Sequence, residues 1–107
     1  MDELSLLQDA DERARRYVAG ADVRRVFPDH SAIDALERFS ERLPDTGRPD
    51  SETLALLDDV GSPATVASNG PNYYGFVVGA TLPAAAAADR LVLAWDQTAS
   101  SFANSPA

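Results

Sequence analysis

The chain has 107 residues, 45% of them hydrophobic, which is enough for one small domain and argues against full disorder. Its net charge of -8 disfavours nucleic-acid binding, because a phosphate backbone would be repelled. All nine basic residues are arginine, and there is no cysteine, so disulfides and thiolate metal sites are excluded.

Three amphipathic helices are predicted in the first half, over residues 4–19, 31–42 and 50–60, because apolar residues recur there at helical spacing. A connector at 21–29 and a proline-containing loop at 43–49 separate them. Asp29 or Ser31 is expected to cap the second helix, and Asp50 or Ser51 the third. Gly61 is expected to end the third helix in the left-handed conformation. The sole histidine, His30, is interpreted as a capping or solvated residue.

The second half begins with a short helical turn at 63–68 and a turn at 69–71. Residues 73–78 are aromatic and β-branched, which predicts an extended segment, although no partner strand is evident.

An alanine-rich helix follows at 83–99, with Thr81 as its expected cap. It has almost no polar face, so we expect it to be buried on most sides, and a chain of this size offers little to bury it against. Its apolar run, 84–95, is too short to span a membrane. The fold class is therefore mainly α, with about four helices and one extended segment.

Asp89 and Asp96 are seven residues apart and share a face of this helix. Paired carboxylates can perform acid–base catalysis, but usually at closer spacing, so structural roles are favoured for both. Asp89 is expected to pair locally with Arg90.

The order of residues from Tyr73 onward is more specific than any of its parts. It comprises Tyr73, Tyr74, Gly75, Phe76, Val77, Val78, Gly79, Pro83, Asp89, Trp95, Asp96 and Gln97, and then Ser105, Pro106 and Ala107. This order resembles the N-terminal part of the pyridoxal-phosphate-dependent decarboxylases of the aromatic-amino-acid and glutamate decarboxylase group, in the aspartate aminotransferase superfamily. The resemblance covers residues 61–107 well and residues 4–60 more loosely.

The resemblance implies an N-terminal helical segment at 1–60 that packs across a homodimer, and the truncated start of the decarboxylase domain at 61–107. The full-length family has an α/β fold of type I, uses pyridoxal 5'-phosphate and acts on an amino acid. Carried over by position, Phe76, Val77 and Gly79 would line the substrate pocket. This apolar lining would favour aromatic or other bulky amino acids as substrates.

The absence of lysine bears directly on activity, because such enzymes hold pyridoxal phosphate on a lysine amine. We therefore expect the N-terminal piece of a decarboxylase, which is inert alone. Separately, we expect it to lie in the cytoplasm and to bind neither nucleic acid nor membrane. The alternative is a small acidic helical module that docks on a partner protein through residues 73–78 and the 83–95 helix.

Overall fold

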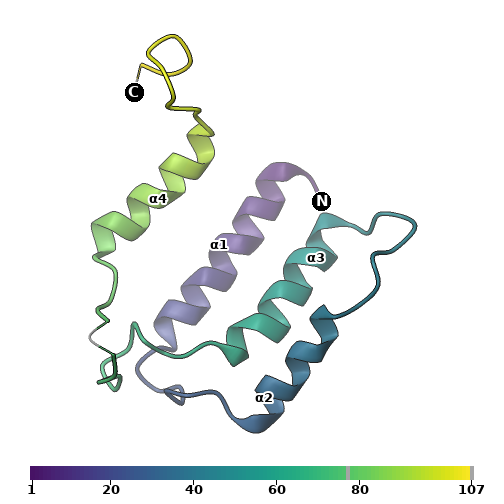
Figure 1. The fold of residues 1–107 in the computed structure, drawn as a ribbon, viewed down its shortest axis with the longest axis vertical. Coiled ribbons are helices and arrows are strands. Elements are labelled where there is room, and N and C mark those ends of the chain that lie inside the picture. The colour runs from purple at the N-terminus through teal and green to yellow at the C-terminus, as the bar shows by residue number, and fades with distance from the viewer. Residues whose placement is uncertain (77, 107) are drawn as a thin grey trace.

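The computed structural model describes residues 1–76 and 78–106, and within them the chain forms four α-helices and no β-strand (Figure 1). The prediction of a mainly helical chain is therefore confirmed. No helix in these two ranges is long and apolar enough to cross a membrane.

Helix α1 runs over Glu3–Ala19, close to the predicted bounds. It begins at Asp2, whose carboxylate accepts a hydrogen bond of 2.8 Å from the Ser5 amide. It ends at Gly20, whose amide donates to the Arg16 carbonyl.

Helix α2 runs over His30–Ala35 and tightens into the 3₁₀ turn η1, Leu36–Phe39. Asp29 is the cap, since its carboxylate accepts from the Ala32 amide at 2.9 Å, while the exposed His30 is the first helical residue. The predicted end at residue 42 is wrong. The helix tightens into the 3₁₀ turn η1, and the chain leaves it at Ser40, whose amide donates to the Glu37 carbonyl.

Helix α3, Asp50–Leu56, continues without a break through the π-helical turn η2, Leu57–Gly61, and the 3₁₀ turn η3, Ser62–Ala64. Pro49 is the N-cap, so the predicted cap at Asp50 or Ser51 is wrong.

The predicted left-handed Gly61 is also wrong, because its φ of -76° and ψ of -46° are right-handed helical. The Asp58 carboxylate accepts a hydrogen bond from the Ser62 hydroxyl at 2.5 Å, which joins the two turns on either side of Gly61.

The small core lies where the segment after α3 folds back on the connection after α1. Its buried apolar residues among those described are Ala21, Pro28, Val60 and Ala67. The Ala67 amide donates to the Val26 carbonyl at 2.8 Å, so the two connections are joined by their backbones. Helices α1, α2 and α3 thus form one packed unit (Figure 1).

Helix α4, Pro83–Trp95, lies on the far side of α1 from α2 and α3 (Figure 1). Leu82 is its N-cap, so the predicted cap at Thr81 is wrong. It ends before the predicted residue 99 because Asp96 adopts the left-handed conformation, with φ of 46°. None of its residues is buried in this chain, contrary to the expected burial.

The predicted extended segment at 73–78 is interrupted. The chain bends at Gly75 and Phe76, and Phe76 has a positive φ of 55°, which an extended strand residue does not have.

Candidate functional site

Two of the three residues expected to line a substrate pocket lie on the exposed connection between η3 and α4. The Phe76 side chain is 92% exposed, and the space around Gly79 is open, since a Cβ added there would meet no atom within 4 Å. The third, Val77, lies outside the described residues. The structure brings Phe76 and Gly79 close to no catalytic group.

The N-terminal part of this connection is bonded to the rest of the chain. The Asn72 side-chain amide donates to the Asp22 carbonyl at 3.3 Å, and the Tyr73 hydroxyl folds back toward Gly75. Tyr74 is 92% exposed, whereas Tyr73 is partly covered. An aromatic pair of this kind in solvent lacks the surroundings that a substrate pocket would give it.

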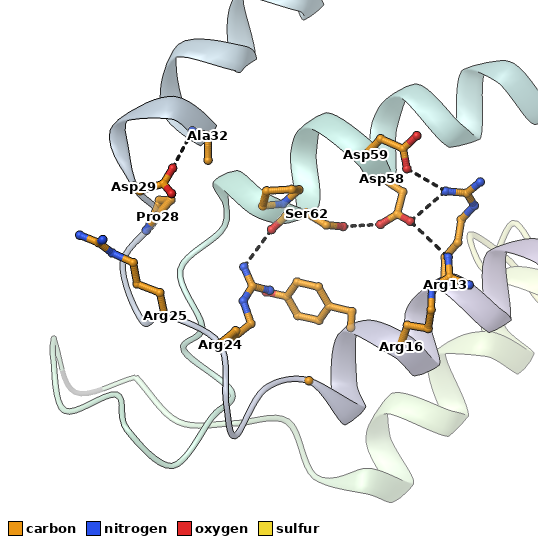
Figure 2. Close-up of a pocket in the computed structure, with 13 residues that line it drawn as sticks. Arg13, Arg16, Arg24, Arg25, Pro28, Asp29, Ala32, Asp58, Asp59 and Ser62 are labelled. Carbon is orange, nitrogen blue, oxygen red and sulfur yellow. Dashed lines mark hydrogen bonds and ion pairs between the residues drawn. The ribbon is translucent and has the colours of Figure 1, made fainter.

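A hollow with a strongly charged lining lies elsewhere, between the C-terminal half of α1, the start of α2 and the η2–η3 turns (Figure 2). Its volume is about 630 Å³. Four arginines and three aspartates line it: Arg13, Arg16, Arg24, Arg25, Asp29, Asp58 and Asp59. The sequence-based analysis did not identify this cluster.

Asp58 is the centre of the charged network (Figure 2). Its carboxylate accepts from Arg13 Nη1 at 2.9 Å and from the Ser62 hydroxyl, and Arg16 lies 3.8 Å away. Arg13 also reaches Asp9 at 3.1 Å and Asp59 at 3.3 Å. The network joins α1 to the turns that follow α3.

The ionisation of these groups follows from the same contacts. The Ser62 hydroxyl, and then Arg13, hold the pKa of Asp58 below its ordinary value. The hydrogen bond to Asp58 raises the pKa of Arg13. At the edge of the hollow, the Ala32 amide lowers the pKa of Asp29. These three shifts favour the charged forms of Asp58, Arg13 and Asp29.

Arg24 closes the other side of the hollow. Its guanidinium lies 4.4 Å from the centre of the Tyr17 ring and donates to the Ser62 carbonyl at 2.9 Å. The Tyr17 hydroxyl in turn lies 2.7 Å from the Thr65 hydroxyl. Arg24 also donates to the Thr65 carbonyl at 3.2 Å, so it bonds backbone oxygens at both ends of η3.

These contacts assign the hollow a structural role. Arg13 and Arg24 donate hydrogen bonds to groups of the chain itself. No cluster of three potential metal ligands occurs in the described ranges. The only sequence signal was the spacing of Arg13 and Arg16 on one face of α1, together with the Asp58–Asp59 pair.

A second hollow of about 480 Å³ lies between α1 and α4 and has a mostly small-residue lining that includes Ala14, Ala86 and Ala87. Arg90 crosses it to Asp11, with Nε 3.0 Å from Oδ1. The expected local pair of Asp89 with Arg90 is therefore replaced by a contact between two helices.

The residues present do not fit a pyridoxal phosphate site on their own. The chain has no lysine to hold the cofactor, and the arginines of the larger hollow are engaged with the aspartates and carbonyls beside them. No step of a reaction can be derived from this chain alone.

Comparison with known proteins yields no relationship: no family model, no curated protein and no solved structure matches the chain.

Proposed function

We propose that this chain is the N-terminal segment of a pyridoxal-phosphate-dependent amino acid decarboxylase. In the intact enzyme it would supply contacts across a homodimer and part of the substrate pocket, through Phe76, Val77 and Gly79. A large α/β domain of fold type I, with the cofactor lysine, would be supplied by other polypeptide. The observation that carries this proposal is the ordered run of residues from Tyr73 to Gln97.

The exposure of this same run supports the proposal. Phe76 is 92% exposed, and Leu91, Val92 and Trp95 on α4 are 55–57% exposed. Such large apolar side chains are normally covered in a finished protein when they lie close together. A segment that packs against further protein would have this surface.

The surface area of the whole chain supports it as well. The chain exposes 8579 Å², whereas a folded monomer of its mass exposes about 5,800 Å². The excess of about 2,800 Å² is larger than one partner loses in an ordinary interface, about 800 Å². The chain therefore carries more uncovered surface than a self-sufficient domain of its size.

The test uses the longest natural polypeptide that contains these residues. With pyridoxal phosphate added, it should release CO₂ from at least one amino acid, and the 107-residue chain should release none because it has no lysine. A natural polypeptide that contains no lysine, or one that folds and releases no CO₂ from any amino acid, would overturn the proposal.

A substitution in that polypeptide tests the pocket. Phe76→Ala should raise KM for a bulky amino acid by about tenfold while KM for a small one changes little, because lost apolar contact affects the larger side chain more. The matched control is Phe102→Ala, which removes another exposed phenylalanine outside the proposed pocket. Equal effects of the two substitutions would contradict the assignment of Phe76.

The second candidate is a small acidic interaction module without catalysis. The excess surface favours it too, since an uncovered apolar helix on an acidic chain is typical of a docking segment. The two candidates differ in the natural polypeptide: a module has no lysine-bearing domain and no decarboxylase activity, but would be found as a defined complex.

A further inference from the structure

One asparagine of this chain lies in a chemically reactive sequence. The chain has three asparagines, Asn69, Asn72 and Asn104, and only Asn69 is followed by glycine. The side-chain amide carbon of an asparagine can be attacked by the backbone nitrogen of the next residue, and a Cβ on that residue hinders the attack. Gly70 has no Cβ, so this hindrance is absent at Asn69. The residues after Asn72 and Asn104 are a tyrosine and a serine, which both carry a Cβ.

The structure restrains the other two asparagines but not Asn69. The Asn72 side chain donates to the Asp22 carbonyl at 3.3 Å, and the Asn104 side chain donates to the Ser100 hydroxyl at 2.9 Å. Asn69 is exposed, and its side chain forms no hydrogen bond with any residue that the structure describes. Its amide is therefore free to turn toward the backbone nitrogen that follows it.

The packing of the chain requires glycine at the next position. A Cβ at Gly70 would lie 2.6 Å from the carbonyl oxygen of the buried Ala21, which is closer than real contacts allow. The fold therefore demands at this position the residue that leaves Asn69 open to attack. The attacking Gly70 amide donates to the Ala67 carbonyl at 3.2 Å, at the long end of the range for such bonds, so this bond restrains it only weakly.

We infer that Asn69 is a site of spontaneous deamidation, and that the reaction irreversibly loosens the junction between residues 21–26 and 67–70. The Gly70 nitrogen bonds to Cγ of Asn69, the Cγ–Nδ2 bond breaks, and the Gly70 amide proton leaves with the amide nitrogen as ammonia. Water then opens the cyclic imide at either carbonyl. One opening gives aspartate, and the other gives isoaspartate, in which the main chain runs through the former side chain.

Isoaspartate changes the length of the backbone at the junction. It adds one methylene to the main chain, about 1.5 Å of backbone. The addition falls directly before Gly70, which has no space for a Cβ beside Ala21. On the other side of the turn, Ala67 is only 1% exposed and its amide bonds the Val26 carbonyl at 2.8 Å. Close-packed groups do not accommodate a displacement of this size, so one side of the turn must open.

The first test follows each asparagine in the 107-residue chain, which is incubated at neutral pH and physiological temperature. Peptide mapping by mass spectrometry measures the conversion of each amide to a carboxylate. Asn69 should convert at least about tenfold faster than Asn72 or Asn104, because Gly70 does not hinder the attack. Labelling with an isoaspartyl methyltransferase should identify isoaspartate at this position. Asn69→Gln is the matched variant: its longer side chain cannot close the same ring, so position 69 should stay unmodified over the same period.

The second test measures what the product does to the fold. Anion-exchange chromatography, with Asn69→Asp as the marker for the aspartate form, isolates the isoaspartate form. Its thermal midpoint should lie about 4 °C or more below that of the unchanged chain. Asn69→Asp carries the same added charge on a normal backbone, at an exposed position, and should melt within about 2 °C of the unchanged chain.

Circular dichroism of Asn69→Gln and Asn69→Asp verifies that the helices remain. Conversion of Asn69 no faster than that of Asn72 or Asn104 would overturn the reactive site. An isoaspartate form that melts with the unchanged chain, or no lower than Asn69→Asp does, would overturn the loosening of the junction. Both tests use the chain as described and do not depend on the decarboxylase proposal.

Discussion

Asp58 links α1 to the turns after α3 and accepts contacts from three side chains, those of Arg13, Arg16 and Ser62. Its own side chain is only 22% exposed, so these contacts are partly shielded from water. Charge-assisted hydrogen bonds in such surroundings stabilise more than fully exposed ion pairs do.

Asp58→Asn should therefore lower the free energy of unfolding by about 1 to 2 kcal/mol, because Arg13 loses its closest anionic partner outside its own helix. Chemical denaturation measures the change. The control is Asp59→Asn, whose side chain is 65% exposed and 3.3 Å from Arg13, and which should cost less than about 0.5 kcal/mol. Equal losses would mean that Asp58 is an ordinary surface carboxylate.

The same residue gives stability a pH dependence. The folded state holds the pKa of Asp58 below its ordinary value, mainly through the Ser62 hydroxyl, so the stabilisation is complete above the ordinary carboxyl pKa, about 4. It is lost as the pH falls from there through the folded-state pKa. Denaturation at pH 7 and at low pH should give a smaller difference for Asp58→Asn than for the unchanged chain.

Gly70 shows how closely the two connections approach. A Cβ at this position would lie 2.6 Å from the Ala21 carbonyl oxygen, a backbone atom that cannot move aside without disturbing the core. Gly70→Ala should cost about 1 to 3 kcal/mol. Gly47→Ala, where nothing lies within 4 Å, should change stability by less than about 0.5 kcal/mol, and thermal melting of both variants makes the comparison.

At the level of elements, α2 depends strongly on its cap because it has only six α-helical residues. Asp29→Ala removes the acceptor for the Ala32 amide and should cost about 1 kcal/mol. Ser31→Ala is the control, since its hydroxyl bonds Asp29 rather than the backbone, and it should cost less. If Ser31→Ala proved the more damaging, Ser31 would be the effective cap.

Helix α4 depends more on its local sequence, and less on contacts with other helices, than α1, α2 and α3 do. It forms because alanine favours helix and Pro83 suits the first turn, and it ends where Asp96 turns left-handed. Among the described residues, its side chains bond another helix through the Arg90–Asp11 ion pair, which is exposed and stabilises the position of α4 only weakly.

The whole molecule is extended for its length. Its radius of gyration is 17.0 Å, against about 13 Å for a compact domain of this size. The buried apolar residues in the described part of the chain are all small or medium in size: Ala21, Pro28, Val60 and Ala67. Such a core gives limited cooperativity to unfolding.

Thermal melting followed by far-ultraviolet circular dichroism should accordingly give a broad transition. Its midpoint should not change with pyridoxal phosphate, because the chain has no lysine to hold the cofactor. A sharp transition that pyridoxal phosphate shifts upward would mean that the chain is a ligand-binding unit by itself.

The positions of the helices follow from local sequence. Apolar spacing, the Asp29 cap and the alanine run predict four helices, because these signals act within one or two turns of the chain. The failures at helix ends also have local causes, such as the 3₁₀ turn that ends α2 and the hydrogen bond from Ser62 to Asp58 across Gly61. The roles expected for Phe76, Val77 and Gly79 stay predictions.

Tertiary structure alone decided which distant residues meet. The contacts of Arg13 with Asp58, Arg24 with Ser62 and Arg90 with Asp11 span 45, 38 and 79 positions. No period or motif encodes these contacts, because they depend on how the helices are placed after the chain turns back on itself. The exposure of α4 was also determined by the tertiary structure. Its composition predicted burial, but the arrangement of the helices leaves all of its residues unburied in this chain.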